Sequence, residues 1–387
     1  MPPFLHMLQA LIAQPSISSA NAAQDMSNLA VIELLAQWLK EIGFSIEIQD
    51  LPSNKANLIA TLGSGPGGLV LAGHTDTVPC DDSLWQSDPL TLSDRDQRFY
   101  GLGSTDMKGF FAVALEAARE FGQRPLQQPL IVLATADEET SMAGARALAA
   151  AGIPKARYAV IGEPTGLKPV HCHKGVMMES IALEGKSGHS SNPALGRSAL
   201  DSMHRVIGEL MTLRHEWGER YQNPAFEVIV PTLNLASIHG GDATNRICRH
   251  CELRFDVRLL PGMQNEEIRQ QIRQRIERSL EGSAVTAHYQ SLFPGVEPYL
   301  EPVSSELLKF SEQLTGHRAT AASFATEAPF LQQLGMQTMV LGPGDINCAH
   351  CADEYLAQDQ IKPAISLLKS LIHEYCVKAQ VPDILTA

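Results

Sequence analysis

The chain has 387 residues, of which 44% are hydrophobic and 19% are charged, and its formal net charge at pH 7 is −13. Its length predicts two domains, because one ordinary hydrophobic core does not serve so many residues. A mean hydropathy near zero, without an apolar run long enough to span a bilayer, is typical of a soluble globular protein. The acidic balance and the lack of Lys/Arg clusters argue against nucleic acid and membranes as partners.

The N-terminus and the cysteines both favour a cytoplasmic location. Residues 1–6 contain neither the basic segment nor the cleavage pattern of a signal peptide. Seven cysteines is an odd number, which indicates reduced thiols in a chain of this length. Two CxxC pairs, Cys248–Cys251 and Cys348–Cys351, are an alternative source of a zinc site. They lie about a hundred residues apart, far beyond the spacing of zinc ribbons, so we interpret them as free thiols.

Residues 1–178 show helical patterns that alternate with short apolar strands. Helices are expected at residues 4–14, 28–42 and 110–121, and strands at residues 45–49, 57–62, 69–72, 130–135 and 158–161. The glycine-rich residues 63–68 precede a strand and lack the Lys-Ser/Thr pair of a phosphate loop, so we interpret them as a hairpin turn. The alternation predicts an α/β fold with a mostly parallel central sheet flanked by helices.

The pattern changes between residues 179 and 290. Strand patterns at residues 178–183, 231–238 and 251–259 are separated by helical patterns at residues 197–214 and 266–280. We therefore expect an inserted α+β domain over residues 179–290. The first domain then comprises residues 1–178 and 291–387, and the second of these segments predicts a helix at 307–314, a strand at 338–341 and a helix from about 359 to 375.

Polar side chains follow the apolar strands of the first domain. They are His74 and Asp76 after the first strand, Glu138 and Glu139 after the second, Glu163 after the third, and then Asp106 and His350 from other segments. Ligands of open α/β sheets bind beyond the carboxyl ends of the strands, where these residues are expected. The alternatives at this point are a purely structural His74–Asp76 pair and an N-cap role for Asp106.

Several carboxylates in one crevice repel one another unless cations neutralise them. Two histidines and three carboxylates are too many ligands for one tetrahedral zinc ion, and they suit two metal ions that share a bridging carboxylate. One further carboxylate is then available to take a proton from water and deliver it to a leaving amine. The pattern predicts a dinuclear hydrolytic centre.

Four motifs resemble the M20 family of metallopeptidases and deacylases, and the resemblance covers essentially the whole chain. The motifs are GHTDTVP at residues 73–79, GLGSTDMKG at 101–109, ADEE at 136–139 and GEP at 162–164. The resemblance implies two divalent metal ions per subunit, with Zn²⁺ fitting best and Co²⁺ as the alternative. It implies that Asp106 bridges both ions, that His74 and Glu163 bind one ion, and that Glu139 and His350 bind the other. It also implies that Glu138 is the general base and acid and that Asp76 orients His74. It also implies a cis peptide bond after Asp106.

The resemblance gives the inserted domain a lid and dimerisation role. Residues 185–191 are similar to a family loop whose histidine, here His189, stabilises the oxyanion, and in dimeric members that loop reaches into the partner's active site. Asn245 and Arg258 match family positions that contact the substrate. The residues alone leave two alternatives open: a solvated loop histidine at position 189, and an ion pair of Arg258 with Asp256. We expect a homodimer.

Three segments, residues 134–146, 239–248 and 326–330, resemble the branch of the family that deacetylates N2-acetyl-L-ornithine. The expected reaction converts this small-molecule substrate to L-ornithine and acetate in arginine biosynthesis, by attack of a metal-bridging hydroxide. Glu327 is our candidate for recognising the side-chain ammonium, and the alternative is a structural glutamate before a turn. Two other functions stay open: a deacylase for N-succinyl-diaminopimelate or other acylated amino acids, and a metal-dependent binding protein without catalysis.

Overall fold

The computed structural model describes residues 1–378 and divides the chain into two compact units. The first unit comprises Met1–His171, Glu301–Thr320 and the chain from Thr326 onward, and the second comprises Cys172–Leu300 and Ala321–Ala325. The predicted insertion at residues 179–290 lies inside the second unit, but a limit at residue 178 would divide the continuous strand β9 (Gly175–Glu184). We therefore propose domain limits at the unit boundaries. Residues 379–387 of the predicted last segment lie outside the described residues.

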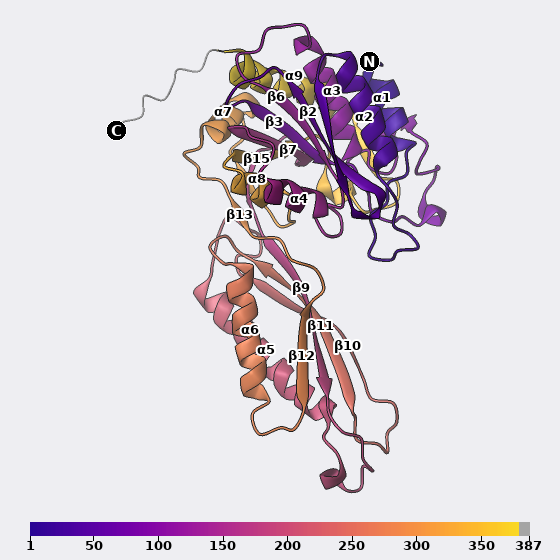
Figure 1. Ribbon diagram of the computed structural model, residues 1–387, viewed down its shortest axis with the longest axis vertical. Coiled ribbons are helices and arrows are strands. Elements are labelled where there is room, and N and C mark those ends of the chain that lie inside the picture. Colours follow the sequence, from indigo (N-terminus) through magenta and orange to yellow (C-terminus); the bar gives the residue numbers. More distant parts are fainter. Residues whose placement is uncertain (379–387) are drawn as a thin grey trace. The chain divides into compact units, whose positions relative to one another are not determined.

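The first unit is built on a twisted sheet whose centre is parallel (Figure 1). In spatial order its strands are β1 (Ser45–Leu51), β2 (Lys55–Leu62), β6 (Leu130–Thr135), β3 (Leu69–His74), β7 (Tyr158–Pro164), β15 (Gln337–Gly342) and β8 (Val170–His173). Strands β6, β3, β7 and β15 run parallel, with β2 and β8 antiparallel beside them. Every residue of β3, β6 and β7 is buried, which explains the apolar runs at residues 69–72, 130–134 and 158–161. The predicted mostly parallel α/β sheet is confirmed.

The interpretation of residues 63–68 as a hairpin turn is wrong. Strand β6 lies between β2 and β3 and pairs with both, so the two strands joined by the glycine-rich turn are not neighbours. The physical reason is that β6 is buried at every position and takes an interior place in the sheet. The actual hairpin is formed by β1 and β2, whose register runs from Ser45–Thr61 to Leu51–Lys55.

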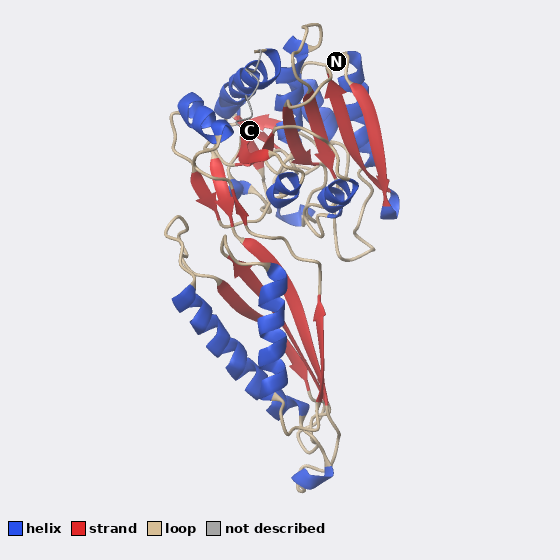
Figure 2. Ribbon diagram, turned by 60° about the vertical axis from the view of Figure 1, so that its left-hand side comes forward, coloured by secondary structure: helices blue, strands red, loops and turns tan. Residues whose placement is uncertain are grey.

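Helices cover both faces of this sheet (Figure 2). One face packs against α1 (Phe4–Ile12), α2 (Leu29–Glu41), α3 (Lys108–Ala118), α7 (Glu306–Thr315) and α9 (Gln358–Ile372), which share one hydrophobic core with it. The other face carries α4 (Ala143–Ala151) and α8 (Ala328–Gln333), which contact each other. A small sheet of β16 (Tyr355–Ala357), β5 (Arg98–Tyr100) and β4 (Ser93–Arg95) completes the unit.

The second unit is an antiparallel sheet with two helices. Its strand order is β10 (Thr232–Gly240), β11 (His250–Leu259), β9 and β12 (Thr286–Ser291), and the helices are α5 (Ala199–Arg220) and α6 (Asn265–Ser279). Leu253, Phe255 and Val257 of β11 alternate with more exposed charged residues and enter a separate hydrophobic core with both helices. Two short strands, β13 (Tyr299–Leu300) and β14 (Thr320–Ala322), pair with β8.

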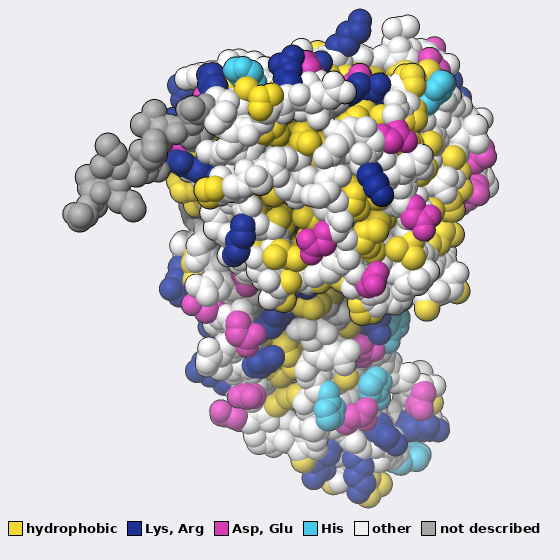
Figure 3. Space-filling model, turned by 45° about the horizontal axis from the view of Figure 1, so that its top comes forward, with side chains coloured by type: hydrophobic (Ala, Val, Ile, Leu, Met, Phe, Trp, Pro, Cys, Tyr) yellow, Lys and Arg dark blue, Asp and Glu magenta, His cyan; other side chains and the backbone are white. Residues whose placement is uncertain are grey.

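The helices and the surface charges are the features that would indicate a membrane protein or a nucleic-acid-binding protein. None of the helices within residues 1–378 combines the length and apolar character that a bilayer crossing requires. On the face shown in Figure 3, basic and acidic side chains of the first unit are interspersed rather than gathered into one basic patch. The part of the first unit seen there therefore lacks the concentrated positive charge that phosphate backbones attract.

Candidate metal centre

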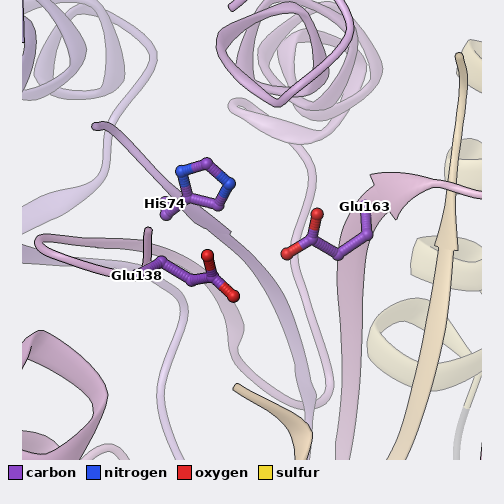
Figure 4. A group of neighbouring side chains, drawn as sticks. All are labelled: His74, Glu138 and Glu163. Atoms are coloured by element: carbon purple, nitrogen blue, oxygen red, sulfur yellow. The ribbon is translucent and has the colours of Figure 1, made fainter. Parts of the chain in front are cut away.

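The carboxyl ends of three parallel strands bring polar side chains together. His74 is the last residue of β3, Glu163 lies near the end of β7, and Glu138 lies in the turn after β6. The register pairs His74 with Thr135, the last residue of β6, so the strands end at the same level. In Figure 4 the carboxylates of Glu138 and Glu163 and the ring of His74 point toward one another.

Two groups of ligand atoms in the described residues are close enough to hold a metal ion. The groups are His74, Glu138 and Glu163, and His74, Asp106 and Glu139, and the ligand atoms within each group lie within 4.8 Å of one another. His350 adjoins the second group, since its Nε2 lies 3.1 Å from Glu139 Oε1 and 3.5 Å from Asp106 Oδ2. Nitrogen and oxygen donors in this number fit divalent cations such as zinc. The structure thus brings all five residues predicted as ligands to one place.

Asp106 lies between the two histidines. Its Oδ1 is 3.0 Å from His74 Nε2, and its Oδ2 is the oxygen that faces His350. The alternative N-cap role fails, because α3 is preceded by Met107 and has no side-chain cap. The peptide bond between Asp106 and Met107 is cis, as the family resemblance implies. A carboxylate with one oxygen toward each histidine has the arrangement expected of a bridging ligand.

Asp76 contacts both His74 and the turn that carries Glu138 and Glu139. His74 Nδ1 lies 2.9 Å from the backbone oxygen of Asp76, whereas the nearest carboxylate oxygen of Asp76 is 3.7 Å away. The carboxylate instead accepts hydrogen bonds from the backbone N–H groups of Glu138 and Glu139, at 3.2 and 3.1 Å. The carbonyl therefore fixes the ring of His74, and the side chain holds the turn that carries both glutamates.

The crowding of buried carboxylates shifts the pKa values of the groups in the centre. Burial, and then the charge of Glu163, raises the pKa of Glu138 well above its usual range, and burial and the charge of Asp106 do the same to the pKa of Glu163. Hydrogen bonds with Asp106 and Glu139 raise the pKa of His350 to about 10. Burial opposes a charge on His74, but its hydrogen bond with Asp106 and nearby carboxylates outweigh burial and raise its pKa. The raised pKa values mean that bound protons offset the negative charge of these carboxylates, at positions that also suit metal cations.

The negative charge of Glu327, at the start of α8, contributes to the raised pKa values of Glu138 and Glu163. The side chain is 2% exposed, and its Oε1 has no hydrogen-bond partner. Burial raises the pKa of Glu327 to about 7, although a hydrogen bond with Thr135 opposes this shift. The carboxylate does not cap α8, so its position has no explanation in helix capping.

Sequence reasoning missed Lys55, which contacts the turn that carries Glu138. Its ammonium contacts Asp137, the residue before Glu138, and lies 2.7 Å from Asp25. Lys55 is 4% exposed, and burying an ammonium is costly unless it is paired. A lysine at the start of an apolar strand carries no local signal of this role, because its partners are distant in the sequence.

The predicted substrate residues of the second unit do not lie together. The loops of His189 and Asn245 adjoin each other, since Ser190 N–H donates to the Asn245 carbonyl and His189 forms a β-bridge with Arg246. His189 is exposed, and its Nδ1 lies 2.7 Å from Ser191 Oγ. Arg258 lies near the other end of β11, where its Nε donates to Asp256 at 3.2 Å. The ion pair weighed as the alternative for Arg258 is therefore present, and His189 is a loop histidine within its own unit.

Neither CxxC pair takes part in a metal group. Both groups among the described residues consist of histidine, aspartate and glutamate only. Cys248 and Cys251 lie in the second unit and Cys348 and Cys351 in the first, and all four are free thiols.

A cavity of about 110 Å³ adjoins His350. Its wall is mostly apolar and comprises Val78, Pro79, Cys80, Asp81, Leu84, Trp85, Leu102, His350, Cys351 and Ala352. Asp81 is the one charged group besides His350 in this wall, and the wall contains neither Lys nor Arg.

The sequence of this chain is similar to those of known proteins over nearly its whole length. Acetylornithine deacetylase of Edwardsiella ictaluri is 49% identical over 378 residues, covering 97% of this chain and 98% of that protein. Acetylornithine deacetylase of Photorhabdus laumondii is 47% identical over 382 residues, with the same coverage.

Solved structures show the same fold at lower identity. An M20 family metallo-carboxypeptidase from Sulfolobus solfataricus has a TM-score of 0.74 and 17% identity, covering 96% of this chain and 99% of that chain. The Bacillus subtilis YXEP protein, a dinuclear metal-binding peptidase of the M20 family, has a TM-score of 0.66 and 17% identity, covering 96% and 98%. The family model described as peptidase family M20/M25/M40 matches residues 70–374, so the chain belongs to this family.

Proposed function

We propose that this protein is a metal-dependent amidohydrolase that cleaves N2-acetyl-L-ornithine to L-ornithine and acetate, a step of arginine biosynthesis. The observation that carries the proposal is the convergence of His74, Asp106 and Glu139 within 4.8 Å, with Glu138 in the same turn. The two relatives named acetylornithine deacetylase, at 47% and 49% identity over nearly the whole chain, support the choice of substrate.

The proposed ligands are His74 and Glu163 for one divalent ion, Glu139 and His350 for the other, and Asp106 for both. Zn²⁺ fits these donors best, and Co²⁺ accepts the same set. Two such ions, when bound, polarise the acyl carbonyl and lower the pKa of a water molecule toward 7. The raised pKa values of Glu138 and Glu163 support this assignment, because cations are what would allow these carboxylates to be ionised together.

Glu138 then moves the proton. It is partly exposed while Glu163 and His74 beside it are buried, so it is the carboxylate of its group most accessible to a substrate. It takes a proton from the attacking water and gives it to the nitrogen of the leaving amine. Asp76 keeps Glu138 in place through the backbone, and His189 and Asn245 would donate hydrogen bonds to the oxyanion.

Two features favour N2-acetyl-L-ornithine among related substrates. The unpartnered Oε1 of Glu327 is a buried acceptor that an ammonium would satisfy and a neutral side chain would not. The small cavity beside His350 has a mostly apolar wall that contains Asp81 and neither Lys nor Arg, which suits an acetyl group better than a succinyl carboxylate. Arg258 would bind the α-carboxylate of the substrate through two parallel hydrogen bonds.

We also propose a homodimer in the cytoplasm. His189 and Asn245 lie at one end of the second unit, and Arg258 lies eight residues along β11 from His250, a separation of about 26 Å at 3.3 Å per residue. Side chains so far apart do not reach one small substrate from the same chain, whereas two chains would supply one end each. The free thiols of Cys248, Cys251, Cys348 and Cys351 support a reducing compartment.

The test is the deacylation rate on N2-acetyl-L-ornithine beside N-succinyl-diaminopimelate and N-acetylmethionine, with Zn²⁺ or Co²⁺ restored to the chelated protein. We expect metal-dependent turnover that strongly favours N2-acetyl-L-ornithine. Metal-dependent turnover that favours another substrate would keep the metal centre and replace the substrate. Absence of turnover with both metals would leave a metal-dependent binding protein.

A further inference from the structure

We propose that Glu354 is a positioning residue that sets the carboxylate of Asp106 relative to His350. Glu354 is 2% exposed and accepts three backbone hydrogen bonds from the loop before α3. Its Oε2 accepts from the N–H of Gly103 at 3.0 Å, and its Oε1 accepts from the N–H groups of Thr105 and Asp106 at 2.8 and 2.9 Å. This inference rests on the ligand set proposed above.

Glu354 joins two chain segments that each carry a proposed ligand. It lies four residues after His350, and it holds the N–H of Asp106 itself. The same segments are joined by a hydrogen bond from Gly101 N–H to the Glu354 carbonyl at 3.0 Å and by one from the Thr105 hydroxyl to the Tyr355 carbonyl. Strands β5 and β16 extend this contact, with Tyr100 opposite Tyr355.

The carboxylate is suited to orienting a ligand, beyond filling space. Its two oxygens accept from three N–H donors and donate to none, which is the pattern of an ionised carboxylate, because that group only accepts hydrogen bonds. Such charge-assisted bonds are directional, so they fix the backbone from which the Asp106 side chain projects. Asp76 does the equivalent for the turn of Glu138 and Glu139, so two buried carboxylates hold the two ligand-bearing turns through backbone N–H groups.

The experiment compares Glu354→Gln with Glu301→Gln. Glu301 is a matched control, because it is 3% exposed and accepts a backbone hydrogen bond from Thr338, yet it belongs to neither metal group among the described residues. The affinity of each metal-depleted protein for Co²⁺ is measured by competition with a chelator, and the visible spectrum of the bound Co²⁺ reports its coordination. Thermal unfolding of the metal-depleted proteins gives the loss of stability alone.

We expect Glu354→Gln to bind Co²⁺ about 10- to 100-fold more weakly than the wild type and to change its spectrum, which is the usual effect of removing a partner of a metal ligand. An amide in place of the carboxylate turns an N–H donor toward one of the three N–H groups. Glu301→Gln should lower the unfolding temperature and leave the Co²⁺ affinity and spectrum unchanged. If Glu354→Gln does not fold, Glu354→Asp retains the charge one methylene short of its partners, and it should also weaken Co²⁺ binding.

Wild-type Co²⁺ affinity and spectrum in a folded Glu354→Gln or Glu354→Asp protein would overturn the inference. Loss of affinity in Glu301→Gln equal to that in Glu354→Gln would also overturn it, because the effect would then be one of general stability. A wild-type protein that fails to bind two equivalents of Co²⁺ would instead contradict the proposed ligand set.

Discussion

Glu138 and Glu139 are neighbours in one turn with different proposed tasks, and substitutions separate them. We expect Glu138→Gln to lower kcat by about 10²- to 10⁴-fold with both metal ions still bound, because proton transfer is lost and the five proposed ligands remain. Glu139→Gln should lose metal as well as turnover, since Glu139 contacts His350 and belongs to a metal group. Rate measurements with metal analysis of both proteins check this. A Glu138→Gln enzyme with wild-type kcat would exclude this residue as the base.

Glu327 should determine which side chain the enzyme prefers. In Glu327→Gln the buried charge is gone, so we expect the preference for N2-acetyl-L-ornithine over N-acetylmethionine to fall by about 10- to 100-fold, the value of one buried charged hydrogen bond. The ratio of the two kcat/KM values is the measurement. Half-buried Glu312, in α7 and outside both metal groups of the described residues, provides the control: Glu312→Gln should leave the ratio unchanged. An unchanged ratio in Glu327→Gln would leave the structural interpretation of this residue.

Protons and metal ions should compete at the two histidines. The pKa of His350 is raised to about 10, so its ring is protonated at neutral pH in the metal-free protein, and the pKa of His74 is shifted in the same direction by Asp106 and the other carboxylates. A cation displaces these protons, and raising the pH toward the raised pKa values weakens their competition. The apparent Zn²⁺ affinity should therefore rise with pH from about 6 to 8, with release of protons.

Calorimetric titrations of the metal-depleted protein with Zn²⁺ measure that release, when they are repeated in two buffers with different ionisation heats. Released protons make the two observed heats differ. Equal heats and a constant affinity across this pH range would contradict the protonated state of the histidines.

Residue types and strand-end positions predicted which polar side chains converge, but the groups that hold these side chains in place could not be predicted from the sequence. His74, Glu139 and Glu163 follow recognisable apolar strands, and their chemistry limits what they can do together. Glu354 and Lys55 bind partners that lie hundreds or tens of residues away, and the partners of Glu354 are backbone N–H groups, which every sequence contains. The Asp76 carboxylate was assigned to the nearest ring in the sequence, although the backbone of the next turn binds it.

At the scale of elements, the close packing of α3 against β7 should control both stability and metal binding. A Cβ at Gly162, beside Glu163, would overlap the ring of Phe110, which is 1% exposed. We expect Gly162→Ala to cost about 1–3 kcal/mol, the usual result of overpacking a core, and to weaken metal binding because the strand carrying Glu163 must shift.

Gly208→Ala is the matched control for this substitution. Gly208 lies inside α5, where a Cβ meets no atom within 4 Å, so alanine should stabilise the helix by about 0.5–1 kcal/mol. Denaturant unfolding and metal affinity of both variants are the measurements. Wild-type stability in Gly162→Ala would mean that Phe110 moves aside without cost.

The strands that could be predicted from the sequence are those that are buried on both faces. Strands buried on both faces were found by their apolar runs, yet their order in the sheet was not, because β6 enters between β2 and β3 from a distant part of the chain. Local pattern determines that a strand forms, whereas its neighbour is chosen by the packing of the whole unit. The hairpin assigned to residues 63–68 was wrong for this reason.

At the scale of the whole molecule, the arrangement of the second unit makes the proposed dimer testable through catalysis. His189 and Arg258 lie toward opposite ends of one sheet, so a substrate held by Arg258 of one chain would receive His189 from the partner. His189→Ala and Glu138→Gln should each reduce turnover strongly, by about 10²-fold or more. Mixing the two inactive proteins under subunit exchange should restore activity, because one active site of each mixed dimer then has an intact Glu138 and an intact His189.

With random exchange at equal amounts, half of the dimers are mixed and each has one complete site, so we expect about one quarter of the wild-type rate. The rate after mixing, with sedimentation analysis of the dimer, is the measurement. Two samples of the same variant mixed together provide the control and should remain inactive. A monomeric protein would contradict the proposal, and so would a mixture that stays inactive although exchange is complete. In either case His189 would serve the active site of its own chain. The second unit would then have to move between binding and catalysis, so that first Arg258 and then His189 reaches the substrate.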